Sequence, residues 1–526
     1  MSRDSHHIYT LPAGRPFLRT LAQGLIDHYG GNSLDLTRIR ILLPTRRACR
    51  SLRETCLDLT GGQAMLLPQM QPVGDVDEEE LEIHIAGRDG TGALDDIPPA
   101  IAPMQRRILL KNLVTHLPHY KDLGDAEALR LASALGNFLD QVYMYDLDWD
   151  NLDTLVPEEV QNHWQITLDF LKILRAHWPA ILAEYGVIDA ADRRNRLLHR
   201  LAGHWAAHPP DTPVIAAGVS GAIPAVGELL GVIAGLPQGS VILPGLDTEL
   251  DQESWDALDP AHPQYGLKQL LSRIGCVREH VRHWPYARDK DEMRIDARNQ
   301  LVREMMRPAA TAEHWQEHLR ADEQVRRKAQ QGLRGLSVYD CDTQRHEAET
   351  IAVIMRETLE TPGRTAALVT PDRALARRVA TACRRWGVEV DDSAGQPLSD
   401  TGIGSYLRAC TEAVEQQFAP LALLSVLKHE LACAGMARAD YARHVRTLDH
   451  ALRGLRSAPG FAGLRRRTSD DGFIDKLEAI FRPLQTLMDQ GQAPFADWLD
   501  AHIETAENLA ADDRYSGRER LWTGDS

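Results

Sequence analysis

Residues 8–17 read IYTLPAGRPF. Residues 8–11 form a short apolar run typical of a buried strand, and residues 12–16 hold the proline and glycine of a tight turn. From about Phe17 to Ile26, apolar residues recur at helical spacing, which predicts an amphipathic helix. A second apolar run lies at 39–43, and a helix is expected over 45–59. Strands that alternate with helices predict a parallel sheet and an α/β fold.

The turn at residues 12–16 lies where P-loop proteins carry the phosphate-binding sequence G-x-x-x-x-G-K-[ST]. This turn consists of Pro12, Ala13, Gly14, Arg15 and Pro16, so it has one glycine and no lysine. Pro16 has no backbone N–H to donate to a phosphate. We therefore expect a degenerate nucleotide site, and an active nucleotide-dependent enzyme is disfavoured.

Arginines are concentrated around the second strand. Between Leu36 and Arg53 the sequence has six arginines and no acid. Thr45 and Arg46 fall at the strand-to-helix turn, where backbone N–H groups and the helix dipole favour a phosphate. One interpretation is a strip that contacts the phosphates of single-stranded DNA. The alternative is a solvated helix face that balances an acidic protein. The arginines are Arg38, Arg40, Arg46, Arg47, Arg50 and Arg53.

The chain of 526 residues is long enough for several domains, and its formal net charge is −16. The acidic balance disfavours a purely electrostatic nucleic-acid binder but allows a local basic surface. Seven scattered cysteines without a C-x-x-C pair indicate reduced thiols. No apolar run approaches the roughly 20 residues that cross a bilayer. With no signal peptide evident, we expect a cytoplasmic protein and no membrane partner.

The pattern of elements predicts two α/β units with helical insertions. A second α/β unit is expected to use strands at 336–339, 366–369 and 388–390, with helices at 344–359 and 373–386 between them. The expected domains are a first unit at 1–97 and 209–284, an inserted helical subdomain at 98–208, a linker at 285–334, a second unit at 335–400 and a helical subdomain at 401–526.

Other clusters give weaker signals. The acidic run at 75–82 could hold Mg²⁺, but a solvated loop is favoured. Asp247 follows a buried strand like a metal-binding Walker B acid, yet without the lysine loop a plain surface turn is favoured. Two histidine pairs, at 116/119 and 280/283, lack further ligands, so no metal is expected. Trp149, Trp164 and Trp178 could stack on bases, although core packing is favoured for the last two.

Longer stretches resemble the AddB subunits of bacterial AddAB helicase–nucleases, in their alphaproteobacterial form. The resemblance extends over the whole chain and depends on no single motif. The stretches that carry it are LPTRRACRSLRE (43–54), GDVDEEEL (74–81), HWQITLDFL (163–171), VIAAG (214–218), ILPGLD (242–247), HPQYGLK (262–268), GQPLSDT (395–401) and RLW (520–522).

This resemblance implies an inactivated superfamily 1 (UvrD-like) helicase fold with two RecA-like parallel-sheet units and helical insertions. It also implies a partner, the AddA motor subunit, and work on DNA ends and single-stranded DNA in double-strand break repair by homologous recombination, including scanning for a Chi-type sequence. The family's nuclease domain, with its Mg²⁺ and in some members an iron–sulfur cluster, has no counterpart here. We therefore expect the N-terminal, helicase-like half, with no catalytic residue, metal or cofactor of its own.

Within that framework, DNA contacts are expected at two strand-to-helix turns. They are Thr45, Arg46, Arg47, Arg50 and Arg53 in the first unit, and Thr370 and Arg373 in the second. The alternative function is a catalytically inert scaffold, whose degenerate helicase fold only supports assembly with AddA. Retention of single-stranded DNA by the isolated chain distinguishes the two.

Overall fold

The computed structural model describes residues 7–30, 33–73, 96–116, 120–121, 123–147, 161–285, 292–316, 323–454 and 457–522. The chain divides into two compact units, Met1–Val338 and Tyr339–Ser526. Each unit is described by itself. The first contains a parallel sheet with helices on both faces, and the second is helical in the part that the structure describes.

The sheet of the first unit has six strands in the order β3-β2-β4-β5-β1-β6, and every neighbouring pair is parallel. The strands β1 and β2 match the apolar runs predicted at 8–11 and 39–43. No apolar run signals β6, because it consists of two exposed polar residues; besides its backbone pairing with β1, Arg282 Nη2 donates to the Tyr9 hydroxyl at 3.3 Å. The strands are β1(Ile8–Leu11), β2(Arg40–Leu43), β3(Gln69–Pro72), β4(Val214–Ala217), β5(Gly239–Pro244) and β6(Arg282–His283).

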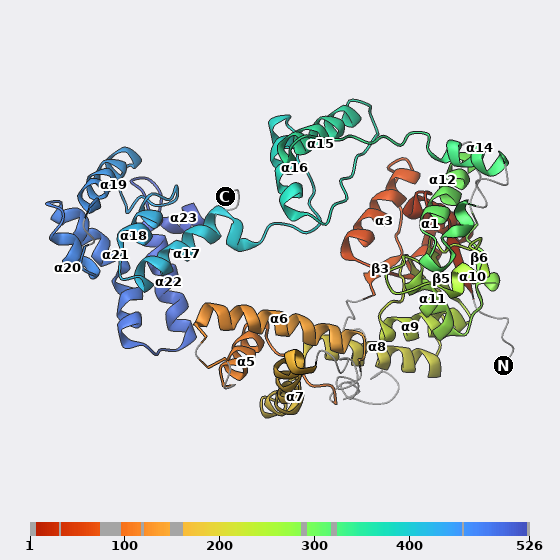
Figure 1. Ribbon diagram of the computed structural model, residues 1–526, viewed down its shortest axis with the longest axis horizontal. Coiled ribbons are helices and arrows are strands. Elements are labelled where there is room, and N and C mark those ends of the chain that lie inside the picture. Colours follow the sequence, from red (N-terminus) through yellow and green to blue (C-terminus); the bar gives the residue numbers. More distant parts are fainter. Residues whose placement is uncertain are drawn as a thin grey trace. The chain divides into compact units, whose positions relative to one another are not determined.

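Helices cover both faces of this sheet (Figure 1). Side chains alternate along each strand, so Val214 and Ala216 face one core while Ile215 and Ala217 face the other. Strands buried on both faces read as continuous apolar runs, which explains why they were visible in the sequence. One face is covered by α1(Phe17–Tyr29) and α3(Arg46–Leu59), and the other by α8(Ala190–Ala207), α9(Pro224–Gly235) and α11(Tyr265–Ile274).

Between β3 and β4 the chain forms the predicted helical insertion. Its core includes Trp178, which is 1% exposed and donates from Nε1 to Asp189 Oδ2 at 2.7 Å. Core packing of this tryptophan is therefore confirmed. The side chains of Trp149 and Trp164 lie outside the described part. The insertion consists of α5(Pro103–Thr115), α6(Asp125–Met144), α7(Gln161–Glu184) and α8, and α8 also packs on α9 of the sheet layer.

The segment expected to be a linker, 285–334, differs from that expectation. It contains α12(Glu292–Met305), the short 3-10 helix η4(Ala309–Thr311) and α14(Glu323–Gly332). Glu304 is 8% exposed and Thr311 is 1% exposed. Two charged residues of the segment, Arg303 and Arg307, pair with acids that follow β5.

The second predicted sheet is wrong for the described part of the chain. The helices α15(Gln344–Leu359) and α16(Arg373–Arg385) form as predicted, but 336–339, 366–369 and 388–390 pair with no other strand there. Val338 and Val369 are 89% and 93% exposed. An apolar run becomes a strand only when a neighbouring strand takes up its backbone N–H and C=O groups.

After Thr401 the described chain is helical, as predicted, around one large apolar core. Tyr406, at the centre, donates its hydroxyl to Ala506 O at 2.8 Å. The remaining helices of both units are α2(Ser33–Thr37), α10(Gln252–Asp256), η3(Arg278–His280), η5(Leu398–Asp400), α17(Gly402–Glu415), α18(Pro420–Leu427), α19(Arg438–Leu452), α20(Gly460–Arg465), α21(Asp471–Gln490), α22(Phe495–Ala510) and α23(Gly517–Trp522).

Candidate nucleic-acid interface

In a parallel α/β sheet, ligands bind at the carboxyl ends of the strands. We call the ends of β1, β2, β4 and β5 the carboxyl edge. At this edge β2 leads through Pro44 and Thr45 into α3. Thr45 has extended backbone angles, and its Oγ1 accepts a hydrogen bond from Ala48 N at 3.1 Å, so its side chain caps the helix. This cap fixes the direction in which α3 leaves the sheet.

The predicted arginines of α3 lie together on its outer side. Arg46, Arg47, Arg50 and Arg53 are exposed, whereas Cys49, Leu52 and Cys56 are buried against the sheet. We call these four arginines the arginine strip. Arg50 pairs with Glu54 at 3.1 Å, but both side chains are more than half exposed (82% and 61%), so the pair is weak and easily exchanged. The strip thus presents positive charge at a helix start that already attracts anions.

The degenerate nucleotide turn is covered by a helix of the same chain. Asn299 on α12 donates from Nδ2 to Ala13 O at 3.0 Å. Gly14 has φ +83°, and a Cβ added there would lie 3.3 Å from Ile295 Cγ2. Ile295, Asn299 and Arg303 are spaced four residues apart along α12. They therefore lie on one face of the helix, which is directed at the carboxyl edge. The space that a nucleotide phosphate would need beside Gly14 is therefore filled by α12.

Asp247, the acid that follows β5, is also occupied. Its Oδ1 accepts from Glu249 N at 2.9 Å and Leu250 N at 3.0 Å. Arg303 Nε lies 3.0 Å from Oδ1 and 2.8 Å from Oδ2 of the same carboxylate. The pair is largely shielded from solvent, since Arg303 is 12% and Asp247 18% exposed. Burial acts to lower the pKa of Arg303, but the hydrogen bond and charge of Asp247 outweigh it and raise that pKa. An arginine takes the place that a metal ion would need.

A second ion-pair network fastens the end of α12. Arg307 is 4% exposed; it donates to Ser254 Oγ at 2.8 Å and to Glu304 Oε2 at 2.7 Å, and it pairs with Asp251 at 2.5 Å. Burial acts to raise the pKa of Asp251, but hydrogen bonds from Ser254 and Arg307 lower it to about 2. Arg303 lies in the last turn of α12 and Arg307 just beyond its end, opposite the alternating acids 247, 249 and 251. No local sequence pattern signals this pairing, because each arginine lies 56 residues from its aspartate.

Thr370 and Arg373 belong to the second unit. Thr370 Oγ1 accepts from Asp372 N at 3.0 Å, and Asp372 caps α16 through Ala374 N and Leu375 N. The guanidinium of Arg373 pairs with both carboxylate oxygens of Asp392, at 3.0 and 2.6 Å. The hydrogen bond to Asp392 raises the pKa of Arg373. In this structure Arg373 holds the loop after residue 388, so a DNA contact there requires exchange of that ion pair.

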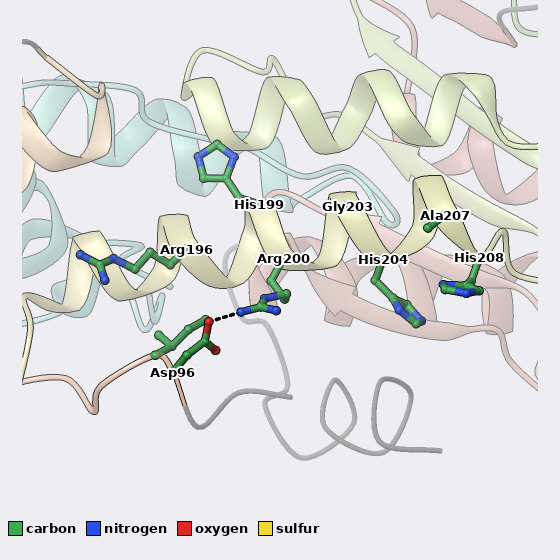
Figure 2. Close-up of a pocket in the computed structure, with 9 residues that line it drawn as sticks. Asp96, Arg196, His199, Arg200, Gly203, His204, Ala207 and His208 are labelled. Atoms are coloured by element: carbon green, nitrogen blue, oxygen red, sulfur yellow. Dashed lines mark hydrogen bonds and ion pairs between the residues drawn. The ribbon is translucent and has the colours of Figure 1, made fainter. Parts of the chain in front are cut away.

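Another basic surface lies along α8, where a hollow of about 580 Å³ opens (Figure 2). Its arginines have acidic partners: Arg200 pairs with Asp96, and Arg196 pairs with Asp192 at 2.8 Å. Figure 2 shows His204 and His208 on the same side of the helix, with ring centroids 5.2 Å apart. With its charges balanced and no nucleophile among its lining residues, this hollow makes a poorer anion site than the arginine strip.

The remaining predicted groups are the acidic run and the histidine pairs. The acidic run at 75–82 and His119 lie outside the described residues. Within the described ranges, no group of three or more His, Cys, Asp or Glu residues is placed to hold a metal ion. In the same ranges, no helix is both long enough and apolar enough to cross a membrane. Comparison with protein-family models and with curated proteins found no match to this chain.

Proposed function

We propose that this chain is a helicase-like, non-motor subunit that binds single-stranded DNA along the arginine strip. The observation that carries the proposal is the contrast within one sheet edge. The turn that would bind a nucleotide is filled by α12, whereas α3, at the same edge, keeps its four arginines at the surface. Such an edge is suited to hold a polyanion and unsuited to hydrolyse ATP.

The chemistry of binding follows from the residue types. Guanidinium groups form paired hydrogen bonds with phosphate oxygens, and the positive end of a helix adds to the attraction. None of these contacts reads a base, so the strip binds DNA of any sequence and with strong salt dependence. Sequence recognition, such as that of a Chi-type element, requires further residues.

The partner in this proposal is an AddA-type motor subunit, which supplies ATP hydrolysis while this chain guides one strand of a broken DNA end. This part of the proposal, together with the inactivated helicase fold and the role in double-strand break repair, is supported by the resemblance to AddB subunits.

The test is fluorescence anisotropy of a labelled oligothymidylate with the isolated chain and with an Arg46→Gln, Arg47→Gln, Arg50→Gln variant. If each arginine neutralises one phosphate, the slope of log affinity against log salt becomes less steep by about 0.7 per arginine, or about 2 in total. At low salt the affinity falls by roughly a hundredfold, which corresponds to about 0.9 kcal/mol for each of the three arginines, within the net range of a single hydrogen bond.

The matched control removes three exposed arginines from the helical bundle, as Arg443→Gln, Arg446→Gln, Arg482→Gln. It changes net charge equally but leaves α3 intact, so we expect less than a tenth of the effect. Equal losses of affinity in the two variants would mean that the arginine strip contributes only through the overall charge of the protein. Unchanged binding in both would favour the inert scaffold that only assembles with its motor partner.

A further inference from the structure

A second arginine cluster lies in the other unit, between α15 and α16. A hollow of about 300 Å³ separates the two helices there. We call it the arginine hollow. Four of its lining residues are arginines and one is an acid. The polar lining residues are Arg345 and Glu349 on α15 and Arg377, Arg378, Thr381 and Arg385 on α16.

The charges of this hollow are not balanced. Glu349 Oε1 is shared by two arginines, at 3.0 Å from Arg345 Nε and 3.4 Å from Arg385 Nη1. Arg377 pairs with Asp400 at 2.6 Å, and Arg378 lies 3.7 Å from Asp372. Even with both of these outer acids counted, cations remain in excess. The helix α16 itself carries five arginines and no acid, in a protein whose net charge is −16.

Many donor positions also lack protein acceptors. A guanidinium has five N–H groups in a rigid fork, and one shared carboxylate cannot satisfy two of them. Arg378 adds a specific case, because its Nε is shielded from solvent and has no hydrogen-bond partner among the described residues. The Thr381 hydroxyl, on the same wall, can donate as well. Guanidinium forks contributed by two helices around one hollow suit an oxyanion such as phosphate, whose oxygens accept paired hydrogen bonds.

We infer that the arginine hollow is a phosphate-binding site, separate from the arginine strip. Its ligand is a phosphoryl group, carried either by a polynucleotide backbone or by a free phosphate compound. Arg345 and Arg385 would hold it from the two helices. Glu349, which now bridges them, would compete with it. The inference does not depend on the proposed function, because the residues belong to the other unit.

The test uses two variants whose structural effects match and whose electrostatic effects are opposite. Arg345→Gln with Arg385→Gln removes the cations, and Glu349→Gln removes the competing carboxylate. Both variants break the same ion pairs. If these residues had only a structural role, the affinity for the ligand would therefore change in the same direction in both variants. A phosphate site predicts roughly tenfold weaker binding for the arginine variant and about threefold tighter binding for Glu349→Gln.

Two probes distinguish the sources of phosphate, each with the full chain. The first is a labelled oligothymidylate, measured in an Arg46→Gln, Arg47→Gln, Arg50→Gln background so that the strip does not mask the hollow. The second is inorganic pyrophosphate, measured by calorimetry. If the two variants shift the affinity in opposite directions for the oligothymidylate alone, the ligand is a nucleic-acid strand. If they do so for pyrophosphate alone, it is a free phosphate compound. If they do so for both probes, the phosphoryl group itself is recognised.

The control is Arg356→Gln, on the same helix α15, where Arg356 pairs with Glu360 at 2.8 Å outside the hollow. It should leave both probes unaffected. Shifts in the same direction for the two test variants, or no shift with either probe, would overturn the inference.

Discussion

Replacing Arg303 by methionine removes the guanidinium that holds Asp247 at the carboxyl edge. An exposed ion pair contributes about 0–1 kcal/mol, and breaking a fully buried one costs about 3–5 kcal/mol. This pair lies between those limits, because the two side chains are 12% and 18% exposed and Asp247 keeps two backbone N–H donors. We therefore expect a loss of about 2 kcal/mol in the free energy of opening α12.

Amide hydrogen exchange is the appropriate assay, because a chain of two units does not unfold in one step. A loss of about 2 kcal/mol corresponds to roughly thirtyfold faster exchange in peptides that cover α12. The control is Arg327→Met on α14, whose ion pair with Glu323 is about 70% exposed on both sides (71% and 68%). Asp247→Asn, measured alone and combined with Arg303→Met, completes a double-mutant cycle and isolates the pairwise energy. Exchange in α12 that is no faster for Arg303→Met than for Arg327→Met would refute the reasoning.

Two further predictions concern the first unit. Because hydrogen bonds hold the pKa of Asp251 at about 2, below its value near 4 in an unfolded chain, its carboxylate stabilises the fold above about pH 4 and ceases to do so as the pH falls towards 2. An acid titration of unfolding should fall less steeply for Asp251→Asn than for the unmodified chain, and equal slopes would contradict this. Trp178→Phe removes a buried donor from Asp189 and should cost about 2 kcal/mol in the free energy of opening α7, measured by amide hydrogen exchange. The exposed Trp386→Phe serves as its control, and equal exchange in α7 for the two variants would show that the hydrogen bond contributes nothing.

Local sequence was enough to predict most of the sheet. Strands such as β2 and β4 are buried on both faces, so their apolar runs are continuous and easily recognised. The arginine strip was predictable for a similar reason, since Thr45 and the arginine spacing are both local features of α3. Core packing of Trp178 followed from helical periodicity alone.

What could not be predicted depends on partners distant in the sequence. Residues 336–339 and 366–369 have the composition of strands, yet in the described structure no neighbouring strand pairs with them. The position of α12 depends on Arg303 finding Asp247, 56 residues away, which no local pattern encodes. The arginine hollow likewise could not be predicted, because its excess of positive charge arises only when α15 and α16 pack side by side.

The closure of the carboxyl edge by α12 has a mechanical consequence. A surface that alternately binds and releases a ligand needs two conformations of comparable free energy. It also needs an event, such as nucleotide binding, that shifts the equilibrium between them. In nucleotide-driven proteins that input arrives at the turn after the first strand. Here the same turn is fastened by Asn299, and the neighbouring acid by Arg303. The edge thus has one resting form, and a strand held by α3 would meet the same surface at every stage of a partner's cycle. Under the proposed function, such a subunit would act as a fixed guide that sets where the strand runs, while a motor partner would supply direction and timing.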